Sequence, residues 1–285
     1  MSSILDYLPQ LPVAPFVENV TAELTQSGRF FFQSIQLAGN SLTDGINAVL
    51  QAVPPGVFLL LLLGLAYLIS RKDKNYVFPV FVGMGMLFIY NQHLWNPFLH
   101  TLSLIIVASV LSVLLGVPLG ILMAKSDRLK LLLTPVLDFM QTMPAFVYLI
   151  PAVAFFGIGI VPGVFASIIF ALPPTVRFTN LGIRQVPGEL VEAADAFGCT
   201  NWQKLLKVEL PIARTTIMAG INQTIMLALS MVVIASMIGA PGLGREVLSA
   251  LQRAQVGNGF VAGVGIVVLA IIIDRFAQKL NKKKF

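Results

Sequence analysis

The side chains best suited to catalysis or metal binding are few in this sequence, and they are widely separated. Two histidines, His93 and His100, and one cysteine, Cys199, cannot form a convincing metal cluster or an internal disulfide. The sequence also has no G-x-x-x-x-G-K-S/T loop for a nucleotide phosphate, no H-E-x-x-H motif and no G-x-S-x-G motif. We therefore expect no catalytic residues, no metal ion and no cofactor.

Charged side chains gather instead in the stretch EAADAFGCTNWQKLLKVELP, residues 192–211. Pro187 is suited to a first helical turn, and Gly198 is suited to the position just past a helix end. Thr200 or Asn201 can cap a second helix, which Pro211 should limit. The apolar side of that helix would be formed by Trp202, Leu205, Leu206 and Leu210. We call residues 187–211 the bracket, because they predict two short polar helices joined by a tight turn.

The rest of the chain has the composition of an integral membrane protein. Of its 285 residues, 56% are hydrophobic and 11% are charged, whereas about 25% of the residues in a soluble domain are charged. A helix crosses the hydrocarbon core with about 17 to 25 residues. Seven apolar runs are long enough: 52–70, 76–92, 98–124, 135–161, 162–178, 214–240 and 259–277. Because Pro144, Pro151, Pro173 and Pro174 can break or kink helices, the sequence predicts an all-α protein with about seven spans, in a range of six to eight.

Lysine and arginine are distributed unevenly between the two sides of these spans. Sixteen of the 19 lie near residues 71–74, 125–130 and 177–214, and from residue 275 onward. The opposite set of connections holds Arg29, Arg245 and Arg253. Because basic loops favour the cytoplasmic side, we expect the N-terminus outside, and the bracket and the C-terminus in the cytoplasm. This clustering also explains the net charge of +6 without a nucleic-acid partner.

Apolar residues recur at helical spacing before the first span, at Phe31, Ile35, Ala38, Leu42, Ile46 and Val49. Much of this stripe is opposed by polar residues, namely Gln33, Gln36, Asn40, Asp44 and Asn47. The pattern predicts an amphipathic helix on the outer membrane face. A helix packed on the outer end of the bundle is the alternative.

The bracket resembles the EAA loop of bacterial ABC importer permeases. The shared pattern is Glu-Ala-Ala, three residues, Gly, nine residues, an aliphatic residue, one residue and Leu-Pro. This sequence matches it at Glu192, Ala193, Ala194, Gly198, Val208, Leu210 and Pro211. In that family the loop contains the coupling helix, which docks in a groove of a separate ATP-binding subunit. The resemblance therefore implies that the bracket, including Trp202, couples this chain to an ATPase; an ordinary amphipathic loop is the alternative.

Two further stretches, DFMQTMPAFVYLIP (138–151) and ALPPTVRFTNLGIRQVP (171–187), look like those of glycine betaine/proline betaine permeases of the OpuA type. The resemblance extends over most of residues 95–277 and implies the permease of an ATP-driven importer of compatible solutes. It implies a type I importer core at 98–277, after an extracytoplasmic segment at 1–51 and accessory spans at 52–97, and before a basic tail at 278–285. The implied partners are an ATPase, an extracytoplasmic substrate-binding lipoprotein and a second copy of the chain, in the lipid of a bacterial cell membrane.

The fourth expected span contains candidates for lining a solute pathway: Asp138, Gln141, Thr142, Pro144 and Tyr148. A charge within a span usually has a partner or a water-filled cavity, and a helix broken at proline exposes backbone groups that can line a pathway. Capping or snorkelling by Asp138, and plain helix packing, are the alternatives. An ion-coupled secondary transporter is the alternative function. It would favour intramembrane carboxylates, of which the sequence offers Asp138 and Asp274.

Overall fold

The computed structural model describes residues 12–71 and 76–281, and every regular element within these ranges is a helix. The predicted all-α class is therefore confirmed. Parts of the predicted segments 1–51 and 278–285 lie outside the described ranges. So do five of the basic residues used to predict the orientation, namely Lys72, Lys74, Lys282, Lys283 and Lys284.

The helices follow one another closely along the chain. The first six are α1 (Val13–Ser27), α2 (Arg29–Ala52), α3 (Pro55–Ser70), α4 (Val77–Asn91), α5 (Trp95–Lys125) and α6 (Asp127–Thr142). A 3-10 turn (Ala145–Tyr148) leads into α7 (Leu149–Phe156), which is followed by α8 (Ile160–Arg184), α9 (Gly188–Ala196) and α10 (Asn201–Lys204). A π turn (Leu205–Glu209) then joins α11 (Leu210–Ala235), and a 3-10 turn (Ser236–Ile238) precedes α12 (Leu243–Gln252) and α13 (Val256–Asn281).

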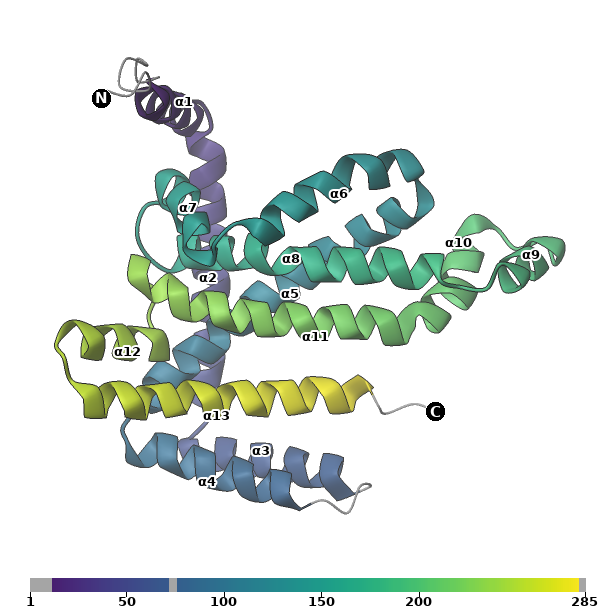
Figure 1. Ribbon diagram of the computed structural model, residues 1–285. Helices are drawn as coiled ribbons and strands as arrows, with labels where there is room; N and C mark the ends of the chain where they lie inside the picture. Colours follow the sequence, from purple (N-terminus) through teal and green to yellow (C-terminus); the bar gives the residue numbers. More distant parts are fainter. Residues whose placement is uncertain (1–11, 72–75, 282–285) are drawn as a thin grey trace, which may run out of the picture.

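Helix α8 packs closely against both α5 and α11, and these helices form the centre of the bundle (Figure 1). A Cβ atom at Gly120 of α5 would lie 2.5 Å from the Cβ of Thr179 on α8. A Cβ atom at Gly220 of α11 would lie 2.5 Å from the Cβ of Phe178, also on α8. Glycines allow membrane helices to approach closely, which strengthens van der Waals packing where lipid provides no hydrophobic driving force.

Four helical segments of the described chain are long and apolar enough to cross a membrane: Trp95–Lys125, Ile160–Arg184, Asn201–Ile238 and Val256–Lys279. The number rises to six if two bent helix pairs, α2 with α3 and α6 with Ala145–Phe156, each form one span. The remaining apolar run, 76–92, corresponds to α4, which has 15 residues. The upper count of six lies within the expected range of six to eight, and it is below seven because α4 is shorter than a usual span.

The fourth expected span, 135–161, is not one straight helix. Helix α6 ends at Thr142, and the chain turns by 111° before Ala145–Phe156. Pro144 explains this break, because a proline disfavours helical geometry at the preceding residue, and Met143 has an extended ψ of 134°. The kinked or re-entrant arrangement that the prolines allowed is the one that forms.

Pro173 and Pro174 behave differently, because they lie inside α8 without ending it. Side chains of the neighbouring helices bond to the α8 backbone about one turn before these prolines. Ser112 of α5 and Thr224 of α11 donate to α8 carbonyls at 3.2 and 2.8 Å. These hydrogen bonds attach α8 to its neighbours at Ile168 and Ala171, on either side of the two carbonyls that the prolines leave without an N–H donor in their own helix.

Helix α2 meets α3 at 93° and crosses α5, α7 and α8 (Figure 1). Thr43 is buried at this crossing, and a Cβ at Gly39 would lie 3.1 Å from a side chain of α8. Phe31, Leu42 and Val49, which belong to the predicted apolar stripe, remain exposed. The helix therefore packs on the bundle, as the alternative interpretation held, while part of its apolar stripe stays free to contact lipid.

Helices α3 and α4 pack against α5 and α13 through aromatic side chains. Phe78 of α4 meets Phe276 of α13 edge to face, with ring centroids 5.5 Å apart. Phe58 of α3 meets Trp95 of α5 in the same way at 5.4 Å. One apolar cluster includes side chains from α3, α4, α5, α11 and α13, so α3 and α4 form one packed body with these later helices.

Candidate functional site

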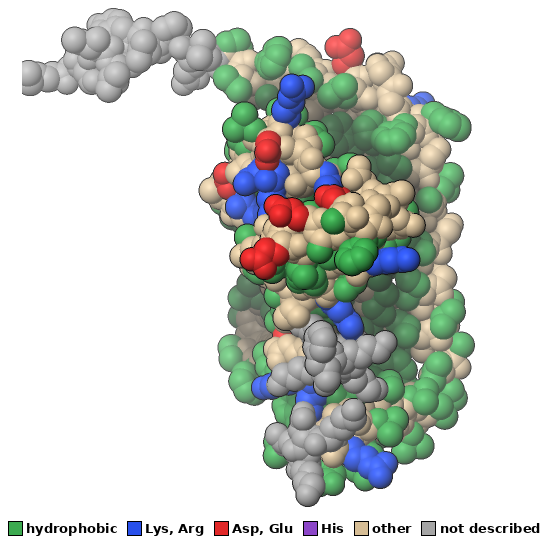
Figure 2. All heavy atoms as spheres, turned by 90° about the vertical axis from the view of Figure 1, so that its right-hand side faces the viewer, with side chains coloured by type: hydrophobic (Ala, Val, Ile, Leu, Met, Phe, Trp, Pro, Cys, Tyr) green, Lys and Arg blue, Asp and Glu red, His purple; other side chains and the backbone are tan. Residues whose placement is uncertain are grey.

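The bracket projects from one end of the bundle, between the end of α8 and the beginning of α11 (Figure 1). The C-terminal ends of α3, α5 and α13 lie at the same end of the molecule, and α12 lies at the opposite end. Seen from this end, acidic and basic side chains gather over the projecting segment beside hydrophobic ones (Figure 2). The described parts of the segments that the sequence marks as basic are therefore on one side of the structure.

The turn of the bracket has the local geometry that its sequence predicts. Helix α9 ends at Ala196, and Gly198 has a φ of 73°, a left-handed conformation that favours glycine. Thr200 caps α10, because its hydroxyl accepts a hydrogen bond from the N–H of Gln203 at 3.3 Å. The Gln203 side chain accepts in return from the N–H of Thr200 at 2.9 Å, which completes a capping box.

The second helix of the bracket does not end at Pro211, so this part of the prediction is wrong. Helix α10 continues through the π turn into α11, and Asn201–Ile238 forms one helical segment of 38 residues. The N–H of Leu210 donates to the carbonyl of Leu205, five residues earlier. This wider turn accommodates Pro211, which has no N–H to donate. The bracket and a membrane helix of the core are therefore continuous.

The predicted coupling residues divide into an exposed group and an inward-facing group. The exposed residues are Glu192, Ala193, Gly198, Trp202 and Pro211. Ala194 is buried, and Leu210 packs on an apolar cluster at the base of the bracket. The sequence did not single out Phe197, which is 87% exposed, while Trp202 is 67% exposed. Exposed aromatic side chains on a projecting segment are typical of a protein contact surface.

Three ion pairs at the bracket were not predicted from the sequence. They are Asp195–Lys204 within the bracket at 2.7 Å, and Lys125–Glu209 at 2.5 Å and Asp127–Arg184 at 2.6 Å at its two ends. The partners at the two ends are too far apart in the chain for spacing to connect them. Glu209 offered a signal, because a carboxylate between Val208 and Leu210 needs a partner if it is buried.

The candidate pathway residues lie on α6 and at its bend. Asp138, Gln141, Thr142 and Pro144 are exposed in the described chain. Asp138 forms an ion pair with Arg177 of α8. Tyr148 is buried, and its hydroxyl donates to the carbonyl of Met140. The structure therefore brings Asp138 to a charged partner and turns Tyr148 toward the interior.

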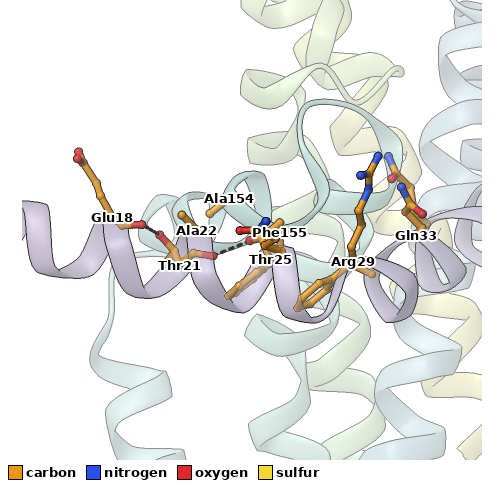
Figure 3. A pocket seen from close by; sticks show the side chains of 11 residues that line it. Glu18, Thr21, Ala22, Thr25, Arg29, Gln33, Ala154 and Phe155 are labelled. Atoms are coloured by element: carbon orange, nitrogen blue, oxygen red, sulfur yellow. Dashed lines mark hydrogen bonds between the residues drawn. The ribbon is translucent and has the colours of Figure 1, made fainter.

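A groove of about 590 Å³, separate from these residues, lies between α1, α2 and α7. Glu18 and Arg29 are at opposite ends of it, and Thr21 and Thr25 bond to carbonyls of their own helix (Figure 3). The sequence reasoning missed this groove because it did not predict α1. In the described part of the chain, no three His, Cys, Asp or Glu side chains group as metal ligands.

The chain belongs to the binding-protein-dependent transport system inner membrane component family, whose model matches residues 116–285. The matched region begins within α5 and includes the bracket. The chain is thus a multi-pass inner-membrane permease of a binding-protein-dependent ABC transporter, and it is not the ATPase. Membership in this family implies an ATPase and a binding protein as partners.

Two curated relatives match nearly the whole chain. The glycine betaine/carnitine transport permease protein GbuB of Listeria monocytogenes is 55% identical over 97% of this chain and 98% of its own length. The glycine betaine transport system permease protein OpuAB of Bacillus subtilis is 46% identical over 98% of both chains. Among solved structures, an inward-facing MetNI methionine ABC transporter aligns with a TM-score of 0.60 at 20% identity. It covers 66% of this chain and 94% of its own, which confirms the importer fold of the core.

Proposed function

We propose that this chain forms the membrane pathway of an ATP-driven importer for compatible solutes of the glycine betaine and proline betaine class. The observation that carries the proposal is the projecting bracket, which has the EAA spacing, a left-handed Gly198 and an exposed pair of residues, Glu192 and Ala193. The substrate class is supported by the two relatives named for glycine betaine transport, at 55% and 46% identity.

In this proposal the bracket docks in a groove of a separate ATPase subunit. The residues proposed to take part in coupling are Glu192, Ala193, Ala194, Gly198, Trp202, Leu210 and Pro211. An exposed surface that combines acidic and aromatic side chains suits such a contact, since aromatic residues dominate the energetics of many interfaces. The single-sided distribution of basic segments supports a cytoplasmic bracket and C-terminus, with the N-terminus outside.

The pathway itself is proposed to run between two copies of the chain, each contributing its core, residues 98–277. The exposed residues Asp138, Gln141 and Thr142 of α6, and Pro144 at the bend after it, then face the pathway, with Tyr148 behind them. A binding lipoprotein delivers solute at the outer side, and α3 and α4 are accessory helices at the lipid boundary. The proposed divisions 1–51, 52–97, 98–277 and 278–285 follow from these roles.

The structure offers less support for an ion-coupled secondary transporter. Such a transporter would need a carboxylate available to a sodium ion or a proton. Asp138 is paired with Arg177. Asp274 accepts hydrogen bonds from Asn222 at 3.3 Å and from Gln278 at 2.9 Å. Both carboxylates that the sequence offered for ion coupling are therefore engaged.

Reconstitution in liposomes tests the proposal. Vesicles containing the chain with its ATPase and binding protein should accumulate radiolabelled glycine betaine only when ATP is present on the ATPase side. Unlabelled proline betaine, carnitine, choline and proline, added as competitors, should rank the solutes. The chain alone should neither hydrolyse ATP nor accumulate solute. Accumulation by the chain alone under a sodium or proton gradient would select the secondary transporter instead.

A further inference from the structure

At the end of the bracket that joins α11, a carboxylate forms an ion pair with the last residue of α5. The Nζ of Lys125 lies 2.7 and 2.5 Å from the two carboxylate oxygens of Glu209. Glu209 is the last residue of the π turn, and its side chain is 6% exposed, whereas that of Lys125 is 39% exposed. The ion pair therefore sits under the bracket with one partner shielded from water.

The segment that leads into the other end of the bracket also contacts the end of α5, and it contacts the start of α6. Arg184, the last residue of α8, lies 2.6 Å from the carboxylate of Asp127 and donates to the carbonyl of Met123 at 3.1 Å. Met123 and Lys125 belong to the last turn of α5, and Asp127 begins α6. We call residues 123–127 the α5–α6 corner. Both segments by which the chain enters and leaves the bracket thus contact this corner through charged side chains.

The bracket itself has little freedom to absorb a displacement. Asp195 of α9 and Lys204 of α10 form an ion pair at 2.7 Å, and the capping box at Thr200 fixes the start of α10. Buried Leu205 packs in an apolar cluster that includes Ile183 of α8 and residues of α5. These contacts keep the bracket from bending internally, so a displacement of the bracket also displaces its two ends.

We propose that the Lys125–Glu209 ion pair makes the α5–α6 corner follow the bracket, so that a displacement of the bracket is passed to α6. Lys125 and Glu209 are then positioning residues for coupling, although Lys125 lies outside the EAA loop. The pair is a poor choice for stability alone, because well-packed apolar side chains often stabilise such a site equally well or better. This inference rests on the proposed function, in which α6 borders the pathway.

The test compares the solute transported per ATP hydrolysed in the reconstituted complex. Lys125→Met and Glu209→Gln should each still assemble with the ATPase and hydrolyse ATP. Their transport per ATP should fall roughly tenfold. The free-energy change that corresponds to a tenfold ratio is within the range of interaction energies measured for pairs of contacting residues. Lys130→Met removes the same charge from an exposed position on α6 and should leave the ratio unchanged. The reversed pair, Lys125→Glu with Glu209→Lys, should recover part of the loss.

A distance measurement tests the same inference without altering the ion pair. Spin labels at Leu131 of α6 and Lys207 of the bracket, both exposed, can be placed in a Cys199→Ser background. Their separation should be the same with and without ATP, because the corner and the bracket move together. A separation that changes with ATP would overturn the inference, as would single variants with the wild-type ratio. A parallel loss of uptake and hydrolysis at an unchanged ratio would also overturn it, since the pair would then serve folding. Failure of the wild-type complex to import solute would instead contradict the proposed function.

Discussion

Gly198 has a backbone conformation that a β-branched residue resists, although there is space for a side chain. Its φ is 73°, and no atom lies within 4 Å of an added Cβ. Gly198→Val should therefore strain the turn by about 1–2 kcal/mol and reduce uptake and binding-protein-stimulated ATP hydrolysis. Gly198→Asn is the matched control, since asparagine tolerates left-handed geometry, and it should retain most activity. Equal activity of the valine variant and the wild type would show that the turn geometry is not needed.

Ala193 and Ala194 are neighbours in the EAA pattern, but the structure assigns them different surroundings. Ala193 is exposed and Ala194 is buried. Ala193→Arg should leave the melting temperature of the purified chain unchanged while abolishing co-purification of the ATPase, because the new side chain would enter the docking contact. Ala194→Arg should lower the melting temperature as well, since a buried, unpaired charge is costly. If the ATPase binds the Ala193→Arg chain normally, the exposed face of α9 is not the docking surface.

At the scale of the helices, close packing of α5, α8 and α11 depends on glycine. Gly120→Ala would place a Cβ 2.5 Å from Thr179 and 2.7 Å from the carbonyl of Val176. Overpacking of this kind usually costs about 1–3 kcal/mol, so the melting temperature in detergent should fall. Gly263→Ala on α13, where no atom lies within 4 Å of the added carbon, should leave it unchanged. A similar melting temperature for both variants would mean that α5 and α8 can separate at little cost.

The helices themselves also show where sequence reasoning succeeds and where it fails. The break at Pro144 was foreseeable, because the effect of a proline on its preceding residue is local. The continuation of α10 through Pro211 was not, since it depends on a π turn whose Glu209 is held by Lys125, 84 residues away. Helix α12 was also missed. It is short and carries Arg245 and Glu246 between apolar residues, so its apolar run is far too short for a span.

At the scale of the whole molecule, the sequence predicts the placement of the bracket but not the ion pairs at its two ends. Seven matched positions between residues 192 and 211 identify the bracket without any tertiary information. The exposure of Phe197 is known only from the folded chain. The ion pairs of Glu209 and Arg184 with the α5–α6 corner depend on how segments that are distant in the sequence pack together. The division of the pathway candidates, with Asp138 exposed and Tyr148 buried, likewise follows from the 111° turn that only the folded chain reveals.

The predicted orientation can be tested on the unmodified chain, because Cys199 is its one cysteine and lies in the bracket. A membrane-impermeant maleimide should label Cys199 in inside-out vesicles and leave it unlabelled in intact cells. The reason is that the basic segments, which favour the cytoplasm, lie at the same end as the bracket. Labelling in intact cells would show that the orientation is opposite to the predicted one. A denatured sample labelled in parallel confirms that the thiol is reactive.

Helix α11, which continues directly from the bracket, also has a geometric consequence for alternating access. With 26 residues and a rise of 1.5 Å per residue, it is about 39 Å long. If α11 tilts by about 10° around its midpoint, its two ends move about 3 Å in opposite directions. A single rotation can therefore narrow an opening on one side of the membrane while widening the opening on the other. Gates at the two sides would then need no separate signal, because the stiffness of one helix would keep them out of phase.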